Sequence, residues 1–166
     1  MNIDLEKIKK LPLDVQKNFM KMYVRWGERQ KESLVNDDFL TFVKHVWPDF
    51  IQGSHHKVVA DKFNKLAEGK IKRLIINMPP RHTKSEFASY LLPAWMVGKN
   101  PKLKIIQSTN TTELSIRFGR KAKFLLDSPE YQEVFQTRLK EDSQAAGKWE
   151  TQQGGEYYAS GVGSAI

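Results

Sequence analysis

The chain has 166 residues, the size of one domain, and 40% of them are hydrophobic, which allows a packed core and excludes disorder throughout. It has no cysteine, which excludes a disulfide scaffold and cysteine zinc sites, and no apolar run of membrane-spanning length or signal-peptide stretch within Met1–Lys10. A net charge of +8 and a pI of about 9.6 suit a phosphate-rich partner, either nucleic acid or nucleotide.

Three amphipathic helices are predicted at the start of the chain. Over Leu13–Arg29, apolar residues recur at the spacing of one helix face. The dipeptide Asn36-Asp37 can cap a second helix, which must stop before Pro48 because proline disfavours a helical residue before it. A third helix is expected over Ser54–Gly69, with the serine as its cap and the glycine at its end.

From Arg73 onward the pattern changes to alternating strand and helix. Leu74–Asn77 is predicted to be a fully buried strand, and Ser85–Val97 a helix that Pro93 kinks or ends. Leu103–Ser108 is a second predicted buried strand. A strand-helix-strand order implies a parallel sheet, so we expect these two strands to pair in parallel as neighbours or near neighbours.

The remainder of the chain continues this alternation. A helix is expected from a capping box at Asn110 to about Leu126, followed by a short helix over Tyr131–Phe135. The pair Gly154-Gly155 then indicates a hairpin turn between two short strands, Trp149–Gln152 and Glu156–Ala159.

These elements predict an α/β fold with an N-terminal helical subdomain. We assign residues 1–35 to the N-terminal helical segment and residues 36–166 to a partial α/β domain, with a linker near residues 31–36.

The segment from Leu74 to Glu86, LIINMPPRHTKSE, has the strand-loop-helix order of a phosphate-binding loop. In such loops backbone N–H groups and the helix N-terminus bind phosphate oxygens, a lysine contacts the β- and γ-phosphates, and a hydroxyl holds Mg²⁺. Lys84 and Ser85 would fill the last two roles. The spelling departs from G-x-x-x-x-G-K-[ST], because Met78 and Thr83 occupy the glycine positions, so an ordinary strand-to-helix turn is the alternative.

The two prolines of this loop have a physical consequence. Each removes an N–H donor, so the phosphate donors must come from Arg81 onward, from the backbone of residues 82–85. If position 83 requires a positive φ, the β-branched Thr83 is strained there.

Residues 38–166 resemble the N-terminal ATPase region of the large terminase subunit of tailed bacteriophages. The stretches that carry the resemblance are Phe42–Ile51 (FVKHVWPDFI), Gly53–His56 (GSHH), Arg73–Glu86 (RLIINMPPRHTKSE), Pro93–Gly98 (PAWMVG), Phe118–Arg120 (FGR) and Gly154–Ala165 (GGEYYASGVGSA). The resemblance implies an incomplete P-loop NTPase sheet of the ASCE/RecA-like type. It also implies an ATP hydrolase that uses Mg²⁺ and pumps double-stranded DNA into a procapsid.

The resemblance also implies roles for single residues. Arg81 would stabilise charge on the γ-phosphate as an arginine finger in cis, and with Lys84 it forms the expected catalytic pair. Gln52 would contact the adenine edge, and His56 or an aromatic residue would stack on the ring. The full set expected to contact the nucleotide is Gln52, His56, Pro80, Arg81, His82, Thr83, Lys84, Ser85 and Glu86, with Ser85 as the Mg²⁺ ligand.

The family places an acidic Walker B strand just beyond a glycine-rich segment like Gly161–Ile166, where this chain stops. We therefore expect a truncated motor domain that hydrolyses little ATP by itself. Implied partners are double-stranded DNA, a portal protein, a small terminase subunit and further copies in a ring on the portal. The implied location is the host cytoplasm, transiently on the procapsid and without a membrane. The alternatives are a helicase-like P-loop ATPase and a catalytically inactive nucleic-acid-binding fragment.

Overall fold

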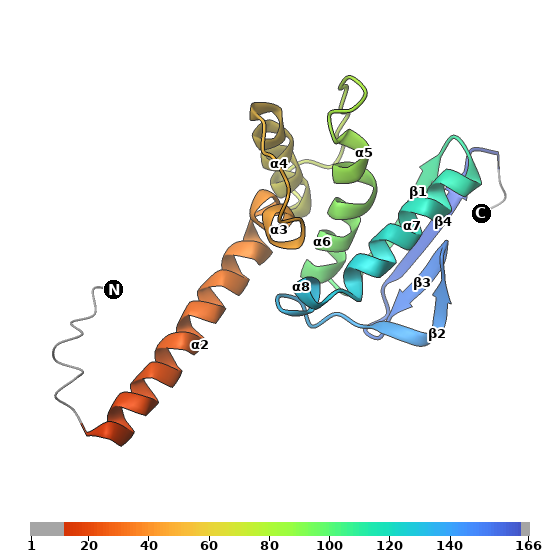
Figure 1. Cartoon of the computed structure of the whole chain (residues 1–166). Coiled ribbons are helices and arrows are strands. Elements are labelled where there is room, and N and C mark those ends of the chain that lie inside the picture. Colours follow the sequence, from red (N-terminus) through yellow and green to blue (C-terminus); the bar gives the residue numbers. More distant parts are fainter. Residues whose placement is uncertain (1–11, 164–166) are drawn as a thin grey trace. The chain divides into compact units, whose positions relative to one another are not determined.

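The computed structural model describes residues 12–163 and contains a small mixed sheet flanked by helices (Figure 1). The chain divides between Leu34 and Val35 into two compact units. Within residues 12–163, no helix is long and apolar enough to cross a membrane. The sheet and the helices around it confirm the predicted α/β class.

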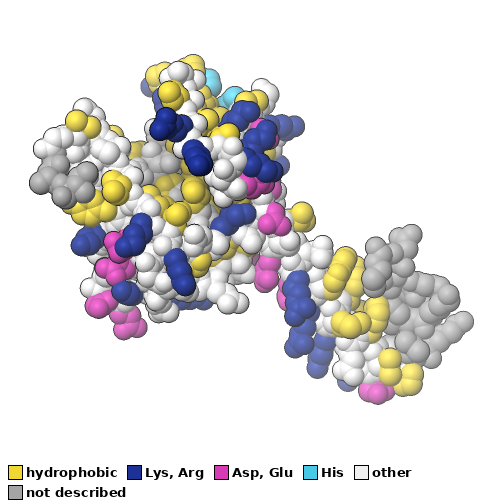
Figure 2. All heavy atoms as spheres, turned by 180° about the vertical axis from the view of Figure 1, so that it is seen from behind, with side chains coloured by type: hydrophobic (Ala, Val, Ile, Leu, Met, Phe, Trp, Pro, Cys, Tyr) yellow, Lys and Arg dark blue, Asp and Glu magenta, His cyan; other side chains and the backbone are white. Residues whose placement is uncertain are grey.

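Helix α2 (Leu13–Asp37) begins directly after Pro12 and extends past its predicted end, so the residues predicted to form a linker, 31–36, are helical. In the first unit this helix is amphipathic. It exposes an aromatic stack, with ring centroids 6.0–6.5 Å apart, that consists of Phe19, Tyr23 and Trp26. Figure 2 shows its basic and hydrophobic side chains in separate rows. Lys17, Lys21, Arg25 and Arg29 recur every four residues, a spacing that places them along one face of the helix.

Helices α3 (Phe39–Val46) and α4 (Ser54–Ala67) open the second unit and lie close to their predicted positions. The cap of α3 is Asp38 rather than the predicted Asn36-Asp37, because α2 continues through those residues. After α4, Gly69 has a φ of 73°, the left-handed conformation that commonly ends a helix at glycine.

Asp38 joins α3 to α4. One carboxylate oxygen accepts the backbone N–H of Thr41 at 2.8 Å, and the other accepts the side-chain amide of Asn64 at 2.8 Å. The Asn64 amide oxygen in turn accepts the N–H of Phe39 at 2.9 Å. Burial opposes ionisation, but the hydrogen bonds from Thr41 and Asn64 outweigh it and lower the pKa of Asp38.

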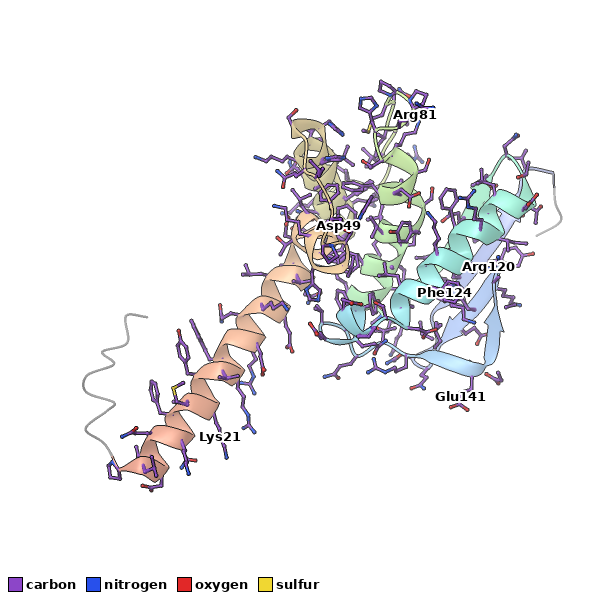
Figure 3. All side chains as sticks on the ribbon, in the orientation of Figure 1. Lys21, Asp49, Arg81, Arg120, Phe124 and Glu141 are labelled. Atoms are coloured by element: carbon purple, nitrogen blue, oxygen red, sulfur yellow. The ribbon has the colours of Figure 1, made fainter. Side chains whose placement is uncertain are left out.

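We expect Asp38→Ala to lower the free energy of unfolding by about 2 kcal/mol, because it removes a helix cap and leaves the Asn64 amide unpaired. Urea unfolding followed by circular dichroism measures the change. Asp49→Ala is the matched control, since it removes the same charge from an exposed turn (Figure 3). Equal effects of the two substitutions would show that the Asp38 contacts do not stabilise the fold.

The helix after the predicted phosphate loop is continuous from residue 84 to residue 99. It consists of α5 (Lys84–Glu86), a π-helical turn η1 (Phe87–Leu91) and α6 (Leu92–Lys99). Of the two effects predicted for Pro93, a kink or an end, the end does not occur, because the helix continues to Lys99. The N–H of Leu92 donates to Phe87 O, five residues back, so the hydrogen-bond pattern is already shifted where the proline lacks its N–H.

The sheet has the strand order β1-β4-β3-β2. Its strands are β1 (Lys104–Thr109), β2 (Leu139–Ala145), β3 (Lys148–Thr151) and β4 (Glu156–Gly161). β1 and β4 pair in parallel, and the other two pairs are antiparallel, so the predicted hairpin is confirmed. Helix α7 (Thr112–Leu126) packs against β1 and β4, and the short helix α8 (Pro129–Gln132) follows it (Figure 1).

Strand β1 lies at the edge of the sheet. The N–H groups of Glu156 and Val162 on the β4 side donate to Leu103 O and Thr109 O, and this alternation leaves residues 104, 106 and 108 facing the other edge. No strand within residues 12–163 pairs with that edge. Ile106 is 64% exposed, so the prediction that this strand is buried was wrong.

The predicted strand Leu74–Asn77 does not form. These residues have no assigned secondary structure, and Ile75 is 87% exposed. The expected parallel pairing of this segment with β1 was therefore wrong. The parallel partner of β1 is β4, which comes later in the chain.

The core of the second unit is largely aromatic. Phe39 lies at its centre, with edge-to-face contacts at ring-centroid distances of 5.0–5.5 Å to Phe63, Phe87 and Trp95. Because Phe87 stands on the helix that follows the phosphate loop, this packing fixes the start of that helix against α3 and α4.

Candidate functional site

The predicted phosphate loop protrudes from the second unit, with Arg81 near its tip (Figure 3). Two non-glycine residues of the loop have positive φ, Arg81 at 65° and Thr83 at 58°. With a ψ of 8°, Thr83 is in the left-handed conformation and immediately precedes α5. It occupies the second glycine position of the motif, so the strain anticipated at this residue is present.

The donors that a phosphate needs are available in this loop. No backbone hydrogen bond among the described residues uses the N–H of Lys84, Ser85 or Glu86, and the next N–H, that of Phe87, donates to Thr83 O at 2.9 Å. Ser85 is exposed. A left-handed residue followed by a helix aims successive N–H groups at one point, which favours an anion.

Lys84 lies across the loop. Its Nζ donates to Met78 O at 3.4 Å, a long and weak bond, and the residue is exposed. The ammonium group is thus held near the loop but can turn to a stronger acceptor. Arg81 is exposed, and its guanidinium makes no hydrogen bond or ion pair with the described residues, so both predicted catalytic cations are accessible.

His56 lies beneath the loop and is 5% exposed. The N–H of Gly53 donates to His56 Nδ1 at 2.8 Å, so Nε2 must carry the ring hydrogen in the neutral form, and Nε2 donates to Thr83 Oγ1 at 2.5 Å. Burial, then the nearby His55 and His82, lower the pKa of His56 below its ordinary value of 6.5. The ring has edge and tilted contacts to Phe50 and Phe87, at 4.8 Å and 5.0 Å.

Two further histidines border the site. The His55 ring lies 3.8 Å from that of His56 and 5.5 Å from that of His82, between ring centroids. His82 is exposed, and its Nδ1 donates to Pro80 O at 2.9 Å, which closes the turn. Among the described residues, no group of three or more His, Asp or Glu side chains could hold a metal ion.

The structure adds a residue that the sequence patterns do not indicate. Lys121 on α7 donates from Nζ to both carboxylate oxygens of Glu86 at 2.9 Å, and its ammonium lies 5.3 Å from the centroid of the Tyr90 ring. Glu86, predicted to contact nucleotide, is thus bound to α7. The pair is 35 residues apart, so no local signal could reveal it.

Gln52 precedes Gly53, whose N–H bonds to His56. It is half-buried, and its amide oxygen has no hydrogen-bond partner. Of the nine predicted contact residues, seven are consecutive in the loop, residues 80–86. His56 contacts this loop through its hydrogen bond to Thr83. Gln52 makes no such contact, but it adjoins Gly53, whose N–H bonds to His56.

We expect the stability contribution of His56 to depend on pH. Because its folded pKa is lowered, the folded protein binds this proton less well than the unfolded chain, so stability falls as the pH drops below 6.5 toward the folded pKa. Above pH 6.5 this contribution is fully present. Urea unfolding at about pH 7.5 and about pH 5.5 should show a larger loss in the wild type than in His56→Gln, which has no ring to titrate. Equal losses of stability in the two proteins would show that the pKa of His56 is not lowered in the folded state.

Comparison of the chain with protein-family models, with curated proteins and with solved structures finds no match in any of the three.

Proposed function

We propose that the chain binds ATP with Mg²⁺ through residues 80–86 and is the nucleotide-binding part of a DNA-packaging motor of the large terminase type. The observation that carries this proposal is the backbone of the loop. Thr83 is left-handed directly before a long helix that Lys84 and Ser85 open, and the first N–H groups of that helix have no backbone acceptor. In the same proposal the α/β unit is an incomplete P-loop NTPase domain.

The residues present suit a triphosphate. Unpaired N–H groups of residues 84–86 and the Lys84 ammonium would hold its phosphates, and the exposed Ser85 hydroxyl would hold the Mg²⁺ ion that neutralises them. Arg81 would face charge developing on the γ-phosphate. The Gln52 side chain would contact the adenine edge through its amide after turning outward, since its unpartnered amide oxygen is buried.

The motor role rests on the resemblance described above and on the net charge of +8, which favours contact with the phosphates of DNA. In this proposal double-stranded DNA, a portal protein and a small terminase subunit are the partners, and the location is the host cytoplasm.

Calorimetric titration with ATP, ADP and AMP, each with Mg²⁺, tests the nucleotide site. We expect ATP and ADP to bind and AMP to bind much more weakly, because the donors of the loop contact the β- and γ-phosphates. Equal affinity for the three nucleotides would place recognition on the adenosine instead. If none of them binds, the proposal fails, and a non-enzymatic nucleic-acid-binding role takes its place.

A further inference from the structure

Thr83 has a conformation that its own side chain disfavours. Left-handed backbone is rare for a β-branched residue, because Cβ then crowds the carbonyl oxygen that follows it. Thr83 has a φ of 58° and a ψ of 8°, which is the left-handed conformation that usually requires glycine. Contacts outside the loop must therefore offset this backbone strain.

A chain of hydrogen bonds supplies such a contact. The N–H of Gly53 donates to His56 Nδ1, His56 Nε2 donates to Thr83 Oγ1, and Thr83 Oγ1 donates to His82 O at 2.6 Å. Each donor meets an acceptor only when His56 is neutral with its hydrogen on Nε2. The Thr83 hydroxyl is thereby fixed at both ends.

His56 itself is held rigidly. It stands in the first turn of α4, is 5% exposed, and has ring contacts to Phe50 and Phe87. Because packing already fixes the rotamer of His56, its ring loses little conformational entropy when it donates a hydrogen bond to Thr83.

We propose that His56 is a positioning residue for phosphate binding: through Thr83 Oγ1 it holds the loop in the left-handed form that presents the N–H groups of residues 84–86. This inference rests on the proposed function for its effect on ATP affinity, but not for its effect on the loop. His56 acts from below the loop through Thr83 and need not touch the nucleotide.

A pair of substitutions separates this role from the capping of α4. Asn places an oxygen where Nδ1 accepts the Gly53 N–H but has no donor at the position of Nε2, whereas Gln places an N–H donor near that position. We expect the NMR chemical shifts of the Thr83 backbone in the nucleotide-free protein to change in His56→Asn and to stay near wild type in His56→Gln. Thr83→Val, which removes the hydroxyl and leaves His56 untouched, should resemble His56→Asn. Unchanged Thr83 shifts in both His56→Asn and Thr83→Val would overturn the proposal.

Titration with Mg²⁺ and ATP gives the second readout, with thermal unfolding of each variant measured alongside. We expect binding to weaken about fivefold to tenfold in His56→Asn, the effect of one hydrogen bond, and to stay within about twofold in His56→Gln. Glycine adopts the left-handed form without strain and does not need the bond from His56. Adding His56→Asn to Thr83→Gly should therefore weaken ATP binding by less than about twofold.

The two readouts fail independently. An equal loss from His56→Asn with threonine or glycine at position 83 would show that His56 acts elsewhere and would overturn the proposal. If the wild type binds no ATP, the proposed function fails, and the Thr83 shifts still decide whether His56 positions the loop.

Discussion

Replacing Lys84 by alanine is expected to weaken binding of ATP with Mg²⁺ by about 10- to 100-fold, the effect of losing a hydrogen bond from a charged group. The ammonium is exposed, and its bond to Met78 O is long, so little protein stability depends on it. Calorimetric titration measures the affinity, and unfolding in urea checks that stability is unchanged.

Two loop variants serve as controls for Lys84→Ala. His82→Ala should weaken binding far less, because the Nδ1 of His82 is already engaged with Pro80 O at 2.9 Å. Arg81→Ala should also largely spare binding, since its expected role is to stabilise the transition state. If Lys84→Ala binds ATP as tightly as the wild type, the phosphate-loop assignment is wrong.

Replacing Trp149 by alanine is expected to lower the free energy of unfolding by about 3–5 kcal/mol, a large share of the stability of a domain this size. Trp149 on β3 is fully buried and stacks on Tyr157 of β4 with ring centroids 4.7 Å apart. Its indole N–H donates to the carbonyl of Gly119 on α7 at 3.3 Å. The side chain therefore binds α7 to the sheet.

The environment of Trp149 cannot close around the missing ring. A Cβ at Gly119 would lie 2.6 Å from Ala146 O and 2.8 Å from a Tyr157 ring carbon, so the helix already approaches the sheet as closely as it can. Urea unfolding measures the loss. Trp26→Ala, at an exposed position of α2, is the control and should change stability by less than about 0.5 kcal/mol. Similar losses from both would contradict this account of the core.

The elements with strong local signals were predictable. Helices α3, α4 and α7 have apolar periodicity in their own sequences, and the hairpin has its Gly154-Gly155 turn. Their caps were predicted less exactly: the observed caps are Asp38, Gly53 and Thr111, where Asn36-Asp37, Ser54 and Asn110 were predicted. Strand β2, LKEDSQA, was not predicted, because it is polar and owes its conformation to pairing with β3. The error at Leu74–Asn77 has the converse cause. An apolar sequence favours a strand, but a strand forms only where a partner edge is available.

The site shows the same division. The order of loop and helix and the strain at Thr83 follow from the motif itself, because the residue occupies a glycine position. The bond from His56 to Thr83 spans 27 residues, and the Glu86–Lys121 ion pair spans 35. Contacts of this kind depend on how α4 and α7 pack, which no local pattern encodes.

The open edge of β1 has a consequence for hydrogen exchange and for self-association. The amides of Ile105, Gln107 and Thr109 face β4 and should exchange slowly with deuterium, whereas those of Lys104, Ile106 and Ser108 face outward and should exchange quickly. Such an edge can also template a strand from another molecule. Lys104, which pairs with Glu156 at 2.8 Å, places a charge on this edge strand, and charges on an edge strand discourage its pairing with another strand. If the protein associates at high concentration by strand pairing at this edge, hydrogen exchange should slow first at these three outward-facing amides.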